Sequence, residues 1–134
     1  MEKSSLQMYI EHLNPLQQKA YFELEGMLKS IDPEICAILF VKQPYFYVSK
    51  YSSIKPHHRP SVMLSFFNDH VNIFALAIRN YQMELSSYKV TPKHTLQLTL
   101  TQEFPHAVLL KIFRESLHPQ KEKFLWNLDL EHPA

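Results

Sequence analysis

The spacing of apolar residues changes once along the chain, and this change constrains the fold more than any other feature. Before Asp32-Pro33 the apolar residues recur at three- and four-residue intervals, the period of an amphipathic helix. After it they form short runs or alternate with polar residues, which is the pattern of strands. Helices followed by hairpin-linked strands predict an α+β domain, in which the helices are segregated from an antiparallel sheet.

Two helices are predicted before this boundary. The first covers residues 5–13. The second begins after Asn14, whose side chain suits an N-cap, and Pro15 has the preferred identity for a first helical residue. It continues to about Ser30 and ends at Asp32, because a residue before proline is pushed out of the helical region.

An antiparallel sheet of about four to five strands is predicted after these helices, with Pro44 separating the first two apolar runs. The predicted strands are 35–41, 45–51, 62–67, 71–77 and 95–101. Asn68-Asp69 indicates a hairpin turn between the third and the fourth. A short helix is predicted at 80–87, before the last strand, and a C-terminal helix follows Pro105.

The length of 134 residues is that of one domain, and no repeat or linker divides it. We therefore expect one α+β domain over residues 1–118. Residues 119–134 form an apolar C-terminal extension that contains Phe124, Leu125 and Trp126. Such a segment is expected to pack on the domain or on a partner.

The N-terminus has no apolar signal-peptide region, and the longest apolar run, 35–41, is too short to cross a membrane. We therefore expect a cytoplasmic protein that does not associate with membranes. Cys36 is the only cysteine, and its apolar neighbours favour a buried thiol over a reactive one.

Charge is distributed unevenly although the net charge is only +1. Residues 1–34 carry six acidic and three basic side chains, whereas residues 35–102 carry seven basic side chains against Asp69 and Glu84. The basic side chains are Lys42, Lys50, Lys55, Arg59, Arg79, Lys89 and Lys93. This asymmetry is either a solvated surface or a means of recognising opposite charge, including a second copy of the chain. The overall balance argues against nucleic acid as a partner.

Few reaction types are compatible with the residues. A single glycine, Gly26, excludes glycine-rich phosphate loops, and no nucleophile is paired with a base, so we predict no catalytic residues and rank an enzyme third, behind the two hypotheses given below. His57, His58 and His70 are the candidate metal ligands, although no two histidines have the helical spacing at which side chains converge.

Several short motifs, taken in order, resemble the YdhG-like family of small bacterial proteins of unknown function. The matching stretches are Pro33-Glu34-Ile35, Gln43-Pro44-Tyr45-Phe46, Asp69-His70-Val71-Asn72-Ile73, Tyr88-Lys89 with Thr91, Lys93-His94-Thr95-Leu96-Gln97-Leu98 and Leu109-Leu110-Lys111-Ile112. Together they span roughly residues 5–118.

The resemblance implies the YdhG-like fold and an iron role, because some members are described as frataxin-like intracellular iron chaperones. Family members usually have glycine where this chain has Lys42-Gln43 and His94, so the backbone there is expected to differ. A frataxin-like role would also rest on an acidic ridge, which residues 1–34 do not show as an ordered pattern. His70 matches a recurrent family histidine, for which a structural hydrogen bond is expected.

Two hypotheses about function follow. The first is a non-enzymatic cytoplasmic protein that binds iron or another small ligand. The alternative is a protein-interaction module, as a homodimer or with another partner, that uses the basic, aromatic middle of the chain or its apolar C-terminal tail.

Overall fold

The computed structural model describes residues 3–119 of the chain. In chain order the elements are α1 (Ser5–Glu11), α2 (Pro15–Ile31), β1 (Ile35–Phe40), β2 (Gln43–Val48), the 3₁₀ helix η1 (Ser49–Tyr51), β3 (Val62–Phe66), β4 (His70–Ala75), the 3₁₀ helix η2 (Leu76–Asn80), β5 (Lys89–Val90), β6 (Leu96–Thr99) and α3 (His106–Leu117). The helices and the antiparallel sheet confirm the predicted α+β class.

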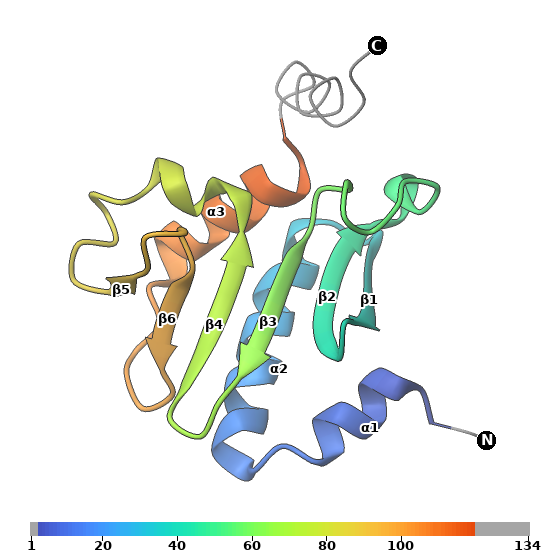
Figure 1. Ribbon diagram of the computed structural model, residues 1–134, viewed down its shortest axis with the longest axis horizontal. Coiled ribbons are helices and arrows are strands. Elements are labelled where there is room, and N and C mark those ends of the chain that lie inside the picture. Colours follow the sequence, from blue (N-terminus) through green and yellow to red (C-terminus); the bar gives the residue numbers. More distant parts are fainter. Residues whose placement is uncertain (1–2, 120–134) are drawn as a thin grey trace.

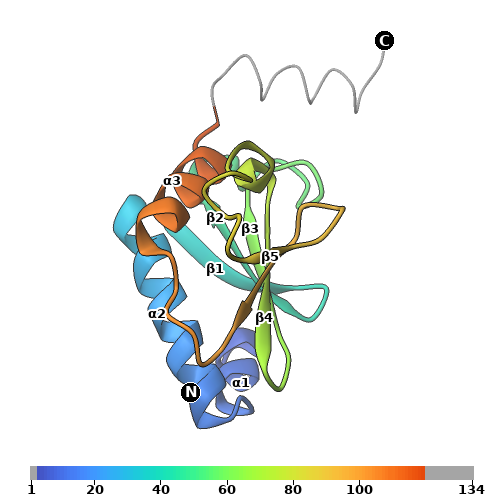
Figure 2. The ribbon, with the colours of Figure 1, turned by 90° about the vertical axis from the view of Figure 1, so that its left-hand side faces the viewer.

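The strands form one six-stranded sheet in the order β1-β2-β3-β4-β6-β5, and every neighbouring pair is antiparallel. Helices α2 and α3 lie side by side across one face of this sheet (Figures 1 and 2). No helix of the described part covers the opposite face, which we call the open face. The loops β1–β2, β2–β3 and β5–β6 project on the side of the open face (Figure 2).

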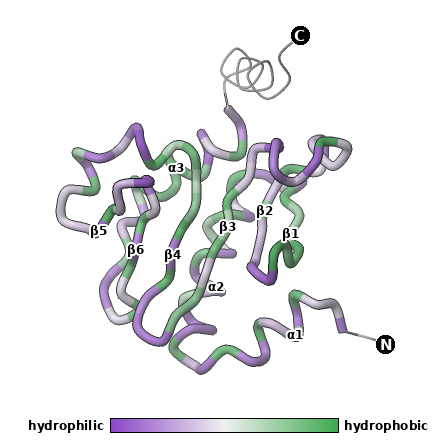
Figure 3. The backbone as a smooth tube through the Cα atoms, viewed as in Figure 1, coloured by the Kyte–Doolittle hydropathy of each residue, from purple (hydrophilic) through white to green (hydrophobic). Residues whose placement is uncertain are grey.

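The core lies between the sheet and the two long helices, because alternate strand residues point toward the helices. Val71 and Ile73 of β4 are fully buried there, and so are Leu96 and Leu98 of β6. Tyr21 of α2 is also fully buried against this layer. The turns that join the strands are largely polar (Figure 3). Within β4 and β6 every second residue is buried, as the alternation in the sequence predicted.

The helix starts are specified locally. Asn14 accepts a hydrogen bond from the Gln17 backbone N–H at 2.8 Å, and the Gln17 side chain accepts one from the Asn14 backbone N–H at 2.9 Å. The Gln17 side chain also donates to the carbonyl of Phe67 at 2.9 Å, which ties α2 to the β3–β4 turn. This confirms Asn14 as the N-cap of α2.

The strand count and the short helix need correction. The sheet has a sixth strand, β5, whose two residues are too few to show any periodicity in the sequence. A short helix does precede the last strands, but it is η2, which ends at Asn80; the placement at 80–87 is wrong, because residues 82–87 form turns. Tertiary contacts hold this segment instead, because the Tyr81 hydroxyl bonds Glu115 of α3 and Leu85 is buried.

Pro44 and Cys36 also differ from expectation. Pro44 lies inside β2, paired with Leu39, rather than breaking the run. Cys36 is half-buried instead of buried, because β1 is the edge strand and every residue of β1 keeps some exposure. Its thiol contacts the Glu34 carbonyl at 3.8 Å.

No helix between residues 3 and 119 is long and apolar enough to span a membrane. The predicted apolar extension lies, beyond Pro119, outside the described residues. The division into a domain and an extension therefore stays a prediction.

Candidate functional site

The three histidines singled out as metal ligands are not brought together. His57 and His58 lie in the β2–β3 loop at one end of the sheet, whereas His70 begins β4 at the other end. Within residues 3–119 no three or more His, Cys, Asp or Glu side chains are grouped so that they could hold a metal ion.

His57 and His70 each make aromatic contacts. The His57 ring meets Phe40 edge-on, with centroids 5.3 Å apart, and the His70 ring stacks on Phe67 at 4.6 Å. His70 Nδ1 lies 2.7 Å from the Asp69 carboxylate, and this hydrogen bond lowers the pKa of Asp69. The structural hydrogen bond expected of His70 is therefore present.

Every carboxylate between residues 3 and 34 has a partner. The pairs are Glu11 with Lys3 at 2.7 Å, Glu23 with His106 at 2.6 Å, Glu25 with the Tyr21 hydroxyl at 2.8 Å, Asp32 with His118 at 2.8 Å and Glu34 with the Ser49 hydroxyl at 3.0 Å. The Glu23 and Asp32 contacts join α2 to α3, the Glu34 contact joins the start of β1 to η1, and the other two are local contacts at α1 and within α2. The acidic N-terminal region therefore forms structural contacts and does not present a row of unengaged carboxylates.

Three cavities provide alternative sites. The largest, about 520 Å³, lies between α1 and the inner face of β1 and β3, and we call it the α1 cavity. A second, about 490 Å³, lies between α2 and the β6–α3 connection, where charges of both signs occur and Glu23 is already paired. A third, about 190 Å³, lies beside the end of β4. The α1 cavity has the size and the apolar lining typical of small-molecule sites.

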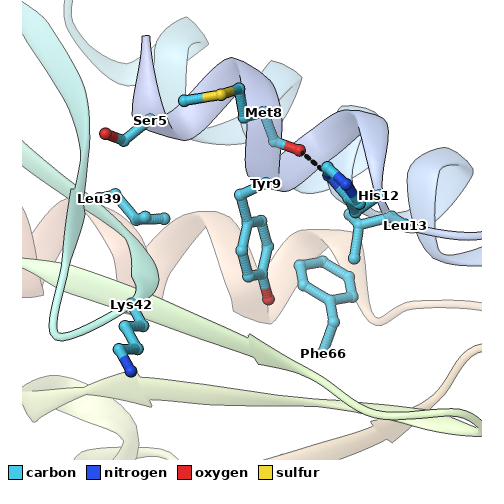
Figure 4. A pocket seen from close by; sticks show the side chains of 8 residues that line it. All are labelled: Ser5, Met8, Tyr9, His12, Leu13, Leu39, Lys42 and Phe66. Atoms are coloured by element: carbon cyan, nitrogen blue, oxygen red, sulfur yellow. Dashed lines mark hydrogen bonds between the residues drawn. The ribbon is translucent and has the colours of Figure 1, made fainter.

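Figure 4 shows the eight side chains that line the α1 cavity. The apolar ones are Met8, Leu13, Leu39 and Phe66, and the polar ones are Ser5, Tyr9, His12 and Lys42. The Tyr9 ring extends from α1 toward the sheet, between Leu39 and Phe66 (Figure 4). Polar groups are therefore few and are distributed around an apolar space.

Helix α1 forms one wall of this cavity. A capping box between Ser4 and Gln7 starts the helix, but seven residues are too few for a stable helix without tertiary contacts, which Ile10 and Leu13 supply against the core. None of its residues is buried, and Met8 keeps 47% of its surface exposed. A wall with so little packing is one of the least stably held elements of the fold.

The described lining of the α1 cavity contains a basic side chain, Lys42, but no acidic one. Lys42 forms no ion pair with any residue between 3 and 119. Burial raises the pKa of the Tyr9 hydroxyl, opposed by a hydrogen bond with the Phe66 backbone, so Tyr9 stays neutral at neutral pH. His12 Nδ1 lies 2.7 Å from the carbonyl of Met8.

Lys42 is placed by an unusual turn. Val41 and Lys42 have φ angles of 45° and 64°, in the left-handed region that favours glycine. Two such residues give the tight two-residue turn that joins β1 to β2. His94, in the β5–β6 loop, has a φ of 64° as well. The two places at which glycine was expected from the resemblance, Lys42 and His94, therefore adopt a glycine-like backbone despite their side chains.

The aromatic middle of the chain forms part of the open face. The Arg59 guanidinium lies 4.2 Å from the Tyr47 ring centroid and donates to the Ile54 carbonyl. Tyr45 donates its hydroxyl to the Pro56 carbonyl at 2.8 Å. These contacts fold the β2–β3 loop over one half of the open face, so these aromatic residues serve the fold.

Sequence reasoning missed the α1 cavity. Tyr9 was one residue of an amphipathic helix, and Lys42 was one of several basic residues. One signal could have singled out Lys42. It lies in a short connection between two predicted strands, and because this connection contains no glycine, its left-handed turn must be made by other residues.

The comparisons with known proteins support the fold. No family model and no curated protein matches the sequence. The structure is similar to the crystal structure of a protein from the DUF1801 family, YdhG of Bacillus subtilis. The TM-score is 0.69, the sequence identity is 13%, and the match covers 97% of this chain and 94% of that one. The fold of this chain is thus the YdhG-like fold that its sequence motifs predicted.

Proposed function

We propose that this protein is a non-enzymatic binding protein that holds a small organic molecule in the α1 cavity. The proposed ligand has an apolar body and an anionic end. The observation that carries the proposal is the combination of a cavity of about 520 Å³, a mostly apolar lining and one cation, Lys42, that forms no ion pair within residues 3–119.

The size of the cavity supports this ligand class. Its volume falls within the roughly 300–1,000 Å³ that is usual for small-molecule sites. Each methylene group removed from water contributes about 0.8 kcal/mol, so a chain of six buried methylenes would contribute about 5 kcal/mol before the entropy lost on binding. An apolar body is therefore sufficient for measurable affinity, and Lys42 adds orientation.

The side chains that line the cavity favour binding over catalysis. A nucleophile requires a base within hydrogen-bond reach. Ser5 makes no side-chain hydrogen bond to His12, whose Nδ1 is engaged by the Met8 carbonyl. Iron binding is supported by the family resemblance alone, and it would require carboxylates that are engaged in other contacts to rearrange.

The proposal is tested by calorimetric titration of the full chain with octanoate, against octanol as the uncharged comparator. We expect saturable octanoate binding, lost in Leu39→Trp because the larger side chain fills the cavity. Lys42→Gln should weaken binding about tenfold, the equivalent of 1.4 kcal/mol for one charge-assisted contact. Lys50→Gln, which removes a charge outside the cavity, is the matched control and should leave the affinity unchanged.

Anaerobic titration with Fe²⁺, beside Zn²⁺ and Mg²⁺, separates this proposal from the iron hypothesis. Saturable binding of Fe²⁺ alone, with no heat from octanoate, would replace the organic ligand by iron. If octanoate binds equally well to Leu39→Trp and to the unchanged chain, the α1 cavity is not its site.

One observation favours the interaction module as a second candidate. Lys42, Lys50, Lys55 and Lys93 lie on the three connections β1–β2, β2–β3 and β5–β6, which project on the side of the open face (Figure 2). A partner with an acidic surface on this side would meet basic side chains of these connections. Light scattering with the full chain at low and high salt tests this: a salt-sensitive dimer would support self-association through these loops.

A further inference from the structure

The third cavity lies apart from α1. It is formed by Phe74, Ala75, Leu76, Arg79, Lys93, His94 and Thr95, and its volume is about 190 Å³. Strand β4, the 3₁₀ helix η2 and the β5–β6 loop bring these residues together from distant parts of the sequence. The α1 cavity shares none of these residues, so the two cavities can be tested separately.

The charged side chains that line this cavity are all basic. Arg79 and Lys93 are exposed cations, and the lining also includes the partly buried His94. None of the described lining residues is acidic, and within residues 3–119 neither Arg79 nor Lys93 forms an ion pair. Cations placed around one small space repel each other unless an anion lies between them.

The loop that presents Lys93 and His94 has a defined conformation. The Thr91 N–H donates to the Thr95 carbonyl at 2.9 Å, the Thr95 N–H donates to the Thr91 hydroxyl at 3.1 Å, and the His94 N–H donates to the Thr91 carbonyl at 2.9 Å. His94 is held at a φ of 64°, where a non-glycine residue is strained. The positions of both basic residues are thus set before any ligand arrives.

His94 has a further feature. Its Nδ1 atom is inaccessible to solvent and has no hydrogen-bond partner among the described residues. A buried polar atom without a partner is unfavourable, so such atoms are rare in folded proteins. Because solvent does not reach Nδ1, a ligand in the cavity bonds to this atom only if the His94 ring turns, so the groups open to a ligand's oxygens are Arg79 and Lys93.

Phe74 supplies an apolar wall. Its side chain is 37% exposed on the open face, although Phe is usually buried, and Leu76 beside it is 52% exposed. A cavity of this volume is close to the roughly 150 Å³ that holds one benzene molecule. It therefore accommodates one small charged group with a ring against Phe74, but not a dinucleotide.

We propose that this cavity is a binding site for a phosphate monoester, with Arg79, Lys93 and His94 around the phosphate and Phe74 against its organic group. Phosphate is favoured over carboxylate because it offers three free oxygens and up to two negative charges, which match the cations that η2 and the β5–β6 loop present, Arg79 and Lys93, with His94 next to Lys93. This site is independent of the ligand proposed for the α1 cavity.

The test is a titration of the isotopically labelled full chain, followed by amide chemical shifts, with inorganic phosphate, phenyl phosphate and benzoate at constant ionic strength. We expect saturable shifts at residues 93–95, with a dissociation constant on the order of 1 mM or lower for phenyl phosphate. Phenyl phosphate should bind about two- to tenfold more tightly than inorganic phosphate because of the ring contact, and Phe74→Ala should remove this difference.

Arg79→Gln and Lys93→Gln should each weaken phosphate binding about tenfold. Both residues are exposed, so the fold is retained, which thermal unfolding verifies. Lys55→Gln removes one positive charge far from the cavity and is the matched control, with less than about a twofold effect. The proposal is wrong if Lys55→Gln weakens binding as much as Lys93→Gln, if benzoate binds as tightly as phenyl phosphate, or if no shift at residues 93–95 saturates.

Discussion

The helix layer and the strand-connecting loops use charged residues in different ways. In the helix layer, Glu23 and Asp32 are paired with His106 and His118, so carboxylates fasten α2 to the start and end of α3. In the loops, Lys42 and Lys93 form no ion pair with any residue that the structure describes, and each lies in or beside a left-handed turn. Charge in the first region is part of the fold, whereas charge in the second is available for a ligand.

This contrast should appear most strongly in stability. Leu28→Ala, which truncates a fully buried side chain of α2, should lower the free energy of unfolding by about 2–5 kcal/mol through lost burial and the cavity left behind. Lys55→Ala in the β2–β3 loop should change it by less than about 0.5 kcal/mol. Urea denaturation measures both values, and similar losses from the two variants would remove the distinction between the regions.

Alkaline pH tests both regions through their tyrosines, Tyr9 and Tyr21 in the helices and Tyr45 in β2, where its hydroxyl bonds the β2–β3 loop. Burial raises the pKa of Tyr21, reinforced by its hydrogen bond to Glu25, and burial also raises the pKa values of Tyr9 and Tyr45. A raised folded-state pKa means that the unfolded state loses its protons first, so stability is complete below pH 10.0 and falls as pH rises above it. We expect tyrosine ionisation, followed by absorbance, to coincide with unfolding. Ionisation of all tyrosines near pH 10.0 in the folded protein would contradict this.

The smallest expected effect concerns the left-handed turns. Lys42→Gly and His94→Gly should each stabilise the protein by up to about 1 kcal/mol, because glycine adopts a positive φ without strain. The gain is reduced by the greater freedom of glycine in the unfolded chain. Thermal unfolding checks the sign, with Lys50→Gly in η1 as the destabilising control. Stabilised variants that also lose ligand binding would show that these loop side chains are retained for function at the expense of stability.

Much of the fold could be predicted from short-range patterns. Asn14 and Pro15 marked the start of α2, and the alternation around Leu96 and Leu98 marked β6. The helix expected at 80–87 does not form, because long-range contacts hold this segment: the Tyr81 hydroxyl bonds Glu115 of α3 and Leu85 is buried, whereas Met83 is exposed. Strand β5 could not be predicted, because its pairing with β6 is decided across the β5–β6 loop.

The candidate sites were far less predictable. The resemblance directed attention to iron, and the histidine count to His57, His58 and His70, which lie at the two ends of the sheet. The residues that line the two cavities of interest carry no local signature. Tyr9 and Phe66 meet only because α1 packs beside the far end of β3, and Arg79 approaches His94 only through the order of strands in the sheet.

The sequence by itself determined the class of fold, the helix starts, the alternation of the strands and the absence of glycine-rich loops, since each depends on residues that are neighbours along the chain. The tertiary structure alone decided that the carboxylates of residues 3–34 have partners, that Lys42 and Lys93 form no ion pair with any described residue, and that each of these two lysines borders a separate cavity. Pairing and cavity formation depend on the distances between elements, and those distances are set by how the helices pack on the sheet.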